Sequence, residues 1–361
     1  MKFTALPVNV GDSFLIRTEN YVVLVDGGMN KQHILKLLRQ EKIPNNHIDL
    51  LICTHYDADH INGIIGILKS QKYSFKELWL PEILGSIGYT LSKNIGELFG
   101  DPRNYNFSIE KYQTNSHSVF DRYESEEINE VSSSNNSFEK IDNDVLSGIG
   151  KAFFPWYDEL FWNFNKINTT SQYKMISSAK SVASLVSNSL SSGAYIRWFK
   201  YQNKETHKTY GFNMYCENSL QTDITLFDRE LFFLALYEIS LSKINKYSLV
   251  YMHRKDEIPD VLFTADSDLN FYSNKVALKN NSIITSPHHG SSANDLAYAK
   301  ITGANLTYVR SDRSQQNRPG KGYLNNQNKF CTICRNITQK QKIEFDFNGT
   351  IFTTSARVCN C

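Results

Sequence analysis

No stretch of the 361-residue sequence is apolar for long enough to span a membrane, and its first ten residues are too short an apolar run for a secretory signal. The chain also lacks a strong excess of either charge, with 39 Lys and Arg against 37 Asp and Glu. An overall electrostatic attraction to nucleic acid or to an anionic membrane is therefore excluded. These absences predict a cytoplasmic protein without membrane contact, whose six cysteines do not form structural disulfides.

The composition predicts a folded chain with a sizeable core, because 41% of the residues are hydrophobic and 13% are aromatic. At about 150 residues per domain, the length fits two domains or one domain with an insertion. Residues 1–80 and 245–325 alternate β-rich runs with helical periodicity. Residues 81–244 are less regular and are interpreted as an inserted subdomain or lid, and residues 326–361 as a tail with a hairpin at Asn348-Gly349.

Four side chains that can bind metal lie within six positions, in His55-Tyr56-Asp57-Ala58-Asp59-His60. They directly follow a nearly continuous apolar run at residues 48–54, which is typical of a buried strand. A helix would spread these positions over more than one face, so we expect a loop that wraps a cation. Imidazole and carboxylate together suit first-row divalent metals. The alternative is a solvated loop with ordinary acidic residues.

Several segments in order resemble the metallo-β-lactamase superfamily. The segments that look like its motifs are residues 24–28 (Leu-Val-Asp-Gly-Gly), 54–60, 262–266 (Leu-Phe-Thr-Ala-Asp) and 287–291 (Pro-His-His-Gly-Ser). The likeness is closest to the soluble metallohydrolase domain of the bacterial competence DNA-uptake channel and its stand-alone relatives. Features of that branch are Gly11-Asp12-Ser13, Asp57 within the metal motif, and residues 245–250.

The resemblance implies an α/β fold, the αββα sandwich of this superfamily, here with a large inserted subdomain. It also implies two divalent cations, zinc or manganese, and a water between them that loses a proton near neutral pH and attacks the substrate. The implied metal ligands are His55, Asp57, Asp59, His60, Asp266 and His289. Asp266 would bridge the ions, with His55 and Asp57 on one and Asp59, His60 and a histidine of the 288–289 pair on the other.

The pair His288-His289 leaves the choice of ligand open. His289 is preferred because in many relatives the ligand directly precedes glycine, and His288 is then a supporting group or a proton donor. The predicted catalytic set is Asp59, Asp266 and His288. Asp57 stands where most members have histidine, which shifts the expected preference somewhat from Zn²⁺ toward Mn²⁺ or Fe²⁺. The usual third-motif histidine has no clear counterpart, since His117 and His207 lie in polar segments typical of the surface.

Two carboxylates and three arginines are candidates for supporting roles. We expect Asp26 to orient the metal loop from behind its ligands, whereas Asp12 is either a turn residue or a second such carboxylate. A basic loop after a predicted strand supplies three candidates for contact with a substrate phosphate: Arg310, Arg313 and Arg318. The alternative for these arginines is a solvated loop.

Four of the six cysteines crowd the end of the chain as Cys331-x₂-Cys334, the predicted hairpin, and Cys359-x-Cys361. Four thiolates that bracket a hairpin could close a tetrahedral structural zinc site. The alternative is four reduced thiols, because the second pair departs from the usual spacing.

The leading hypothesis for function is a metal-dependent hydrolase of a phosphodiester, as a nuclease or a nucleotide phosphodiesterase. Trp156, Trp162, Trp198 and Tyr201 could stack bases, although such residues more commonly belong to a core. A second hypothesis is a hydrolase of a carbonyl substrate, such as an ester, lactone, thioester or peptide, because the same fold serves both chemistries. A third is an effector or binding subunit that depends on a partner protein in a defence-type system.

Overall fold

The computed structural model describes residues 1–85, 169–224, 247–313, 317–334, 340–359 and 361. The chain forms two compact units, one of Met1–Thr90 with Met175–Cys361 and one of Leu91–Lys174. All sheets described below belong to the first unit. None of the helices in the described ranges is long and apolar enough to cross a membrane.

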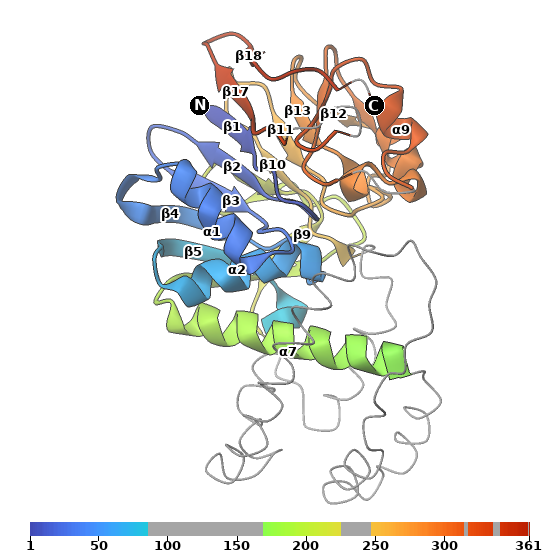
Figure 1. The fold of residues 1–361 in the computed structure, drawn as a ribbon. Helices are drawn as coiled ribbons and strands as arrows, with labels where there is room; N and C mark the ends of the chain where they lie inside the picture. Colours follow the sequence, from blue (N-terminus) through green and yellow to red (C-terminus); the bar gives the residue numbers. More distant parts are fainter. Residues whose placement is uncertain (86–168, 225–246, 314–316, 335–339, 360) are drawn as a thin grey trace, which may run out of the picture. The chain divides into compact units, whose positions relative to one another are not determined.

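The described residues form two large mixed sheets (Figure 1). The first has the order β18-β17-β1-β2-β3-β4-β5-β6-β9. Its strands are β1 (Lys2–Ala5), β2 (Phe14–Arg17), β3 (Val22–Val25), β4 (His47–Ile52), β5 (Ser74–Pro81), β6 (Tyr195–Tyr201), β9 (Ser219–Thr222), β17 (Ile343–Phe347) and β18 (Phe352–Thr353). The second has the order β16-β15-β13-β11-β10-β8-β7. Its strands are β7 (Lys208–Thr209), β8 (Met214–Cys216), β10 (Tyr251–His253), β11 (Val261–Phe263), β13 (Ile283–Thr285), β15 (Thr307–Arg310) and β16 (Lys329–Cys331).

The two sheets pack face to face through a shared apolar core. Phe3 of β1 and Phe14 of β2 lie 6.2 and 6.1 Å, between ring centroids, from Phe263 of the second sheet. Trp79 of β5 lies 5.9 Å from Tyr251 in the same way. Burial of these aromatic rings from both sheets is the main stabilising term of such a sandwich.

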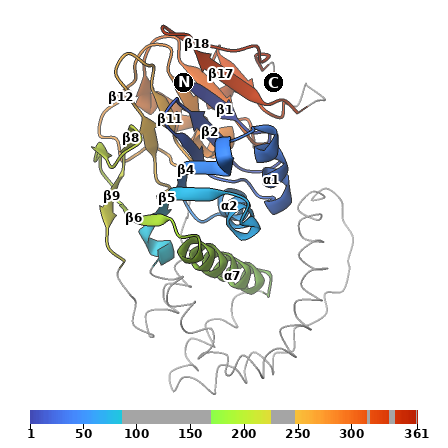
Figure 2. The same cartoon turned by 90° about the vertical axis from the view of Figure 1, so that its left-hand side faces the viewer.

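Helices cover the outer faces of the sandwich (Figure 2). The outer face of the first sheet carries α1 (Lys31–Gln40), α2 (Ala58–Ser70) and α7 (Thr169–Ser191). Because these strands are covered on both sides, β3 is apolar and buried throughout, and β4 is apolar and buried over its last three residues. The outer side of the second sheet has its own core with short helices: η3 (Pro287–Gly290), η4 (Ser292–Lys300) and α9 (Lys321–Leu324), beside a small sheet of β12 (Val276–Ala277) and β14 (Ile301–Thr302). The αββα sandwich predicted from the sequence is confirmed.

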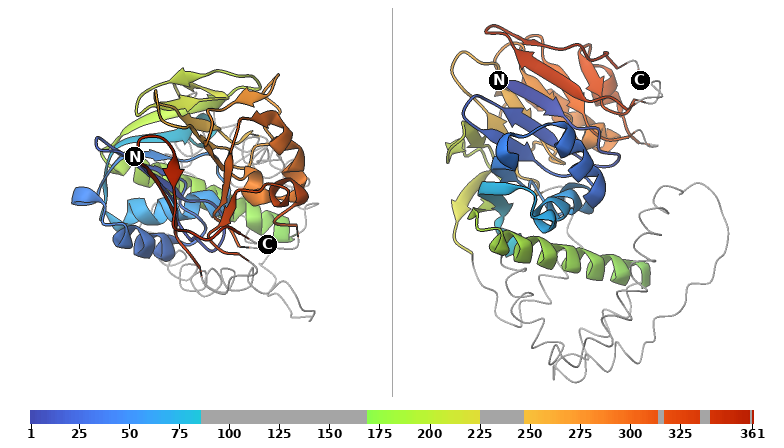
Figure 3. Two further views of the ribbon diagram at one scale, coloured as in Figure 1. Left: turned by 90° about the horizontal axis from the view of Figure 1, so that it is seen from above. Right: turned by 60° about the vertical axis from the view of Figure 1, so that its left-hand side comes forward.

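The C-terminal hairpin is confirmed and is part of the main fold. Strands β17 and β18 pair antiparallel around Asn348, whose backbone N–H donates to the carbonyl of Ile351. Strand β17 also pairs with β1, so the two ends of the chain share one sheet (Figure 3). The preceding strand β16 joins the other sheet, beside β15. The segment predicted as a tail therefore contributes to both sheets.

The predicted insertion at residues 81–244 extends too far toward the C-terminus. Strand β6 pairs with β5, and β8 pairs with β10, so residues 195–222 belong to the two main sheets. The aromatic residues of β6 form part of the core, since Trp198 and Phe199 are buried. Trp156 and Trp162 lie outside the described residues.

Candidate metal centre

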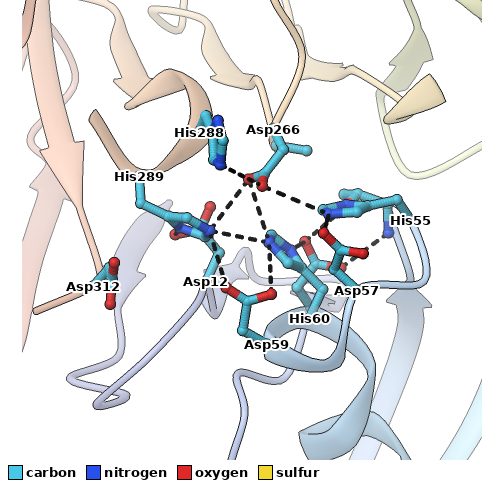
Figure 4. Close-up of polar contacts among 12 residues, drawn as sticks. Asp12, His55, Asp57, Asp59, His60, Asp266, His288, His289 and Asp312 are labelled. Atoms are coloured by element: carbon cyan, nitrogen blue, oxygen red, sulfur yellow. Dashed lines mark hydrogen bonds and ion pairs between the residues drawn. The ribbon is translucent and has the colours of Figure 1, made fainter. Parts of the chain in front are cut away.

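The predicted ligands lie together at the edge of the sandwich, where strands from both sheets end (Figure 4). Strand β4 leads into His55 and Asp57, β11 into Asp266, and β13 into His288 and His289. The pairs β3–β4 and β11–β13 are parallel, which brings their carboxyl ends to the same edge of each sheet.

The metal motif is a strand end followed by the start of a helix, not a continuous loop. Helix α2 begins at Ala58, so Asp59 and His60 occupy its first turn, while His55 and Asp57 precede it. The expectation of a loop over the whole motif was wrong because the motif is divided between a loop and a helix. No single helix therefore has to carry all four side chains on one face. The backbone of α2 at Gly63 lies in close contact with the backbone at Gly27, since a Cβ added to Gly63 would overlap the carbonyl of Gly27. This contact sets the position of α2.

One subsite is formed by Asp59, His60, His289 and one oxygen of Asp266. The Nε2 atoms of His60 and His289 are 3.3 Å apart and lie 3.4 and 3.2 Å from Asp266 Oδ1. Asp59 Oδ2 is 3.3 Å from the same nitrogen of His289. Two imidazole nitrogens and carboxylate oxygens thus converge on one point, as the ligands of a divalent cation do.

A second subsite is formed by His55, Asp57 and the other oxygen of Asp266. His55 Nε2 lies 3.8 Å from Asp57 Oδ2 and 3.8 Å from Asp266 Oδ2. These three residues offer ligand atoms within 4.8 Å of one another. Since its two oxygens face different subsites, the Asp266 carboxylate has the orientation that a bridging ligand requires.

Carboxylates behind the histidines fix which nitrogen of each ring faces the centre. Asp26 Oδ2 accepts a hydrogen bond of 2.8 Å from His60 Nδ1 and one of 2.7 Å from the Thr54 hydroxyl, which lies 3.0 Å from His55 Nδ1. Asp12 Oδ1 accepts a 3.0 Å bond from His289 Nδ1. A proton held on Nδ1 leaves the Nε2 lone pair for a metal. Asp12 and Asp26 therefore lie where a role in orienting ligands would place them.

The donor set fits a metal. Among the described residues, His55 Nε2 and Asp266 Oδ1 are buried and have no hydrogen-bond partner. Burial, the largest influence on His55, lowers the pKa of this imidazole to about 3, so the ring is neutral and can act as a ligand. A cation in the second subsite would satisfy His55 Nε2, and a cation in the first would satisfy Asp266 Oδ1.

His288 and His289 occupy different positions although they are adjacent. Both have positive φ angles, 47° and 52°, a backbone region that side-chain-bearing residues seldom adopt. His289 points into the first subsite. His288 Nε2 lies 3.4 Å from Asp266 Oδ2 but accepts a 2.9 Å hydrogen bond from Arg318, while its Nδ1 donates to Asn294 Oδ1 at 3.2 Å. The nitrogen nearest the centre therefore carries no proton to donate in this arrangement.

The three arginines of the predicted phosphate-binding set lie in different surroundings. Arg318 stands at the centre: its guanidinium bonds Asp312 at 2.9 Å and contacts His288, and the side chain is 17% exposed. Arg310 is fully buried and donates to the backbone carbonyls of Arg313 and Ile333. Arg310 cannot reach a substrate from there, because its side chain has no exposed surface. Arg313 is half-buried, with its backbone N–H bonded to Asn9 and to Asp312.

Two supporting residues were not identified from the sequence. Asn294 donates to the backbone carbonyls of Asp266 and Ser267 and also holds His288. Asp312 is buried and holds Arg318. Asp312 lies within the basic loop, and a carboxylate between two arginines was the only sequence feature that could have indicated its role. Of the candidates for a third-motif histidine, His207 is 48% exposed and pairs with Glu217, and His117 lies outside the described residues.

Comparison with known proteins gives one family. Residues 6–118 match the model of the metallo-beta-lactamase superfamily, so this segment carries a domain of that superfamily. The match includes Asp26 and the metal motif at residues 55–60. No curated protein matches the chain.

Proposed function

We propose that the metallo-beta-lactamase domain in this chain is part of a metal-dependent hydrolase that cleaves phosphodiesters, as a nuclease or a nucleotide phosphodiesterase. The superfamily match and two groups of residues that could hold a metal ion support a metal-dependent hydrolase. These groups are Asp12, His60, Asp266 and His289, and His55, Asp57 and Asp266. The choice of substrate rests on Arg318, a partly exposed cation fixed beside the bridging carboxylate.

Each subsite would hold one divalent cation. His60, His289 and Asp59 would hold the first, His55 and Asp57 the second, and Asp266 both. Two such cations supply a Lewis acid and an acidified water at neutral pH. We propose Mn²⁺ as the native ion, because the carboxylates at Asp57, Asp59 and Asp266 make a hard ligand set.

Arg318 would bind a non-bridging oxygen of the phosphodiester. One nitrogen of its guanidinium donates a hydrogen bond to Asp312 and another donates to His288, which fixes the plane of the group. A planar donor held in place loses little entropy on binding, and guanidinium matches phosphate geometry. An uncharged carbonyl substrate would gain less from this arginine, so its position favours the phosphodiester over an ester or lactone.

The test compares two model substrates, bis(4-nitrophenyl) phosphate and 4-nitrophenyl acetate, with Mn²⁺, with Zn²⁺ and with chelator. We expect metal-dependent turnover of the phosphodiester, and its loss in Asp266→Ala with folding retained by circular dichroism. Turnover restricted to the acetate would contradict the phosphodiester proposal while leaving the hydrolase intact. Phosphodiester turnover that survives Asp266→Ala would contradict the assignment of the site.

A further inference from the structure

Four cysteines from two separate segments of the sequence come together beside β16, and none of them belongs to the candidate metal centre. Cys331 ends β16, Cys334 follows in the next loop, and Cys359 is held by a 2.7 Å hydrogen bond from its backbone N–H to the carbonyl of Lys329. Cys359 Sγ lies 3.0 Å from Cys334 Sγ and 2.6 Å from Cys361 Sγ. Cys361 Sγ is 3.7 Å from Cys331 Sγ. All four are unpaired as disulfides, and three are buried.

A buried arginine lies next to these thiols. Arg310 of β15 stands opposite Cys331 in the register of the two parallel strands and is fully buried. A buried guanidinium needs a negative charge nearby, because its desolvation is costly. The Cys331 sulfur, directly opposite on the neighbouring strand, supplies such a charge when it is ionised.

The surroundings of Cys331 favour a thiolate. A permanent positive charge, the guanidinium-bearing Arg310, stands opposite Cys331 in the register of the two strands. The Tyr323 hydroxyl lies 3.2 Å from the same sulfur, where it can donate. Three thiol groups close to a fourth sulfur that faces a buried arginine form an incipient set of metal ligands, since metal binding displaces the thiol protons.

We propose that Cys331, Cys334, Cys359 and Cys361 bind a zinc ion as a closed tetrahedral structural site, with Arg310 compensating part of its negative charge. A tetrahedral cage with Zn–S bonds of about 2.3 Å places its sulfurs about 3.8 Å apart. The pair Cys331–Cys361 has this separation, and the two pairs that Cys359 makes are closer, so that ion binding would have to move these sulfurs apart. Cys331, Cys359 and Cys361 offer ligand atoms within 4.8 Å of one another. Four thiolates and one Zn²⁺ carry two negative charges, of which Arg310 balances one.

The site would connect the end of the chain to the loop beside the catalytic centre. Arg310 donates to the carbonyl of Ile333 in the cysteine loop and to the carbonyl of Arg313, next to Asp312. Asp312 in turn fixes Arg318. A cation that fixes the cysteine loop would therefore stabilise the segment that positions Arg318.

The test measures zinc bound to the purified full chain, prepared under reducing conditions, dialysed and analysed by plasma mass spectrometry. We expect the double variant Cys334→Ser/Cys359→Ser to lose one zinc per chain. The matched control is Cys216→Ala, a buried cysteine in β8 remote from the cluster, which should keep the wild-type content. Equal zinc content in the wild type and the double variant would overturn the proposal.

A second measurement separates this site from the catalytic one. Cobalt-loaded Asp266→Ala should retain the near-ultraviolet charge-transfer absorption of thiolate-bound cobalt, and the double cysteine variant should lack it. Absence of this absorption from both Asp266→Ala and the wild type would overturn the thiolate site and leave the proposed hydrolase unaffected.

The proposal remains testable if the double variant does not fold. Titration of wild-type thiols with a mercurial should then release one zinc as the cluster is blocked, with six free thiols counted in denaturant. Complete thiol titration without zinc release, or a count below six that shows a disulfide, would overturn the proposal.

Discussion

Replacing Asp26 by asparagine should weaken metal binding in both subsites although Asp26 touches neither. Its carboxylate accepts hydrogen bonds from three donors: the Thr54 backbone N–H at 2.9 Å, the Thr54 hydroxyl at 2.7 Å and His60 Nδ1 at 2.8 Å. An amide has one accepting oxygen and one donating nitrogen. In either orientation of the new amide, at least one buried donor therefore faces an N–H group.

The chemical consequence reaches both ligand histidines. If the amide nitrogen faces His60 Nδ1, the imidazole proton moves to Nε2 and removes the lone pair from the first subsite. The Thr54 hydroxyl, which links Asp26 to His55, loses its acceptor in the same orientation. An unsatisfied buried donor costs about 1–3 kcal/mol. Since about 1.4 kcal/mol is tenfold, metal affinity should fall about 10- to 100-fold.

The assay is competition of the protein with a fluorescent chelator for Mn²⁺, for wild type and Asp26→Asn. Asp268→Asn is the matched control, because among the described residues this half-buried carboxylate accepts hydrogen bonds from Asn270 alone, within its own turn. Wild-type affinity in Asp26→Asn, with folding unchanged, would refute the role of Asp26 in fixing the imidazole tautomers. Equal losses in both variants would show a nonspecific effect.

Three further predictions follow from the geometry. Arg318→Lys should lower kcat/KM for a phosphodiester about 10- to 100-fold, since lysine lacks the planar fork, and unchanged kinetics would remove this arginine from substrate binding. Gly63→Ala should destabilise the fold by about 1–3 kcal/mol and lower metal affinity, because the new methyl group pushes α2 away from Gly27. Urea denaturation measures the first change and metal titration the second, and the absence of both changes would contradict this prediction. Burial lowers the pKa of His253 to about 4, so the unfolded chain binds this proton more readily and stability is lost as pH falls below about 6.5. The free energy of unfolding should drop by about 2 kcal/mol more between pH 7 and pH 5 in wild type than in His253→Gln, and equal slopes would contradict this.

Local sequence patterns predicted most of the fold around the metal centre. The apolar runs at β3 and β4 and the turn at Asn348 identify their elements without reference to distant residues. Strand β6 was missed, because its partner β5 is separated from it by residues 82–194 and its aromatic residues do not alternate. Pairing over such a distance leaves no local signal.

The proximity of the predicted ligands could be expected because most of them follow the ends of strands. The surroundings of the three arginines could not, since they depend on which strand lies next to β15. Strand β16 places Cys331 opposite Arg310, and Arg310 is buried there. Arg318 lies farther along the chain and reaches His288. The charge pattern alone makes these two residues equivalent.

Electron paramagnetic resonance of the manganese-loaded protein tests most directly whether two cations share Asp266. Two Mn²⁺ ions joined by a carboxylate are exchange-coupled, so we predict a binuclear signal in wild type that is lost in Asp266→Ala. A spectrum of isolated, uncoupled Mn²⁺ at saturating metal would contradict the shared site.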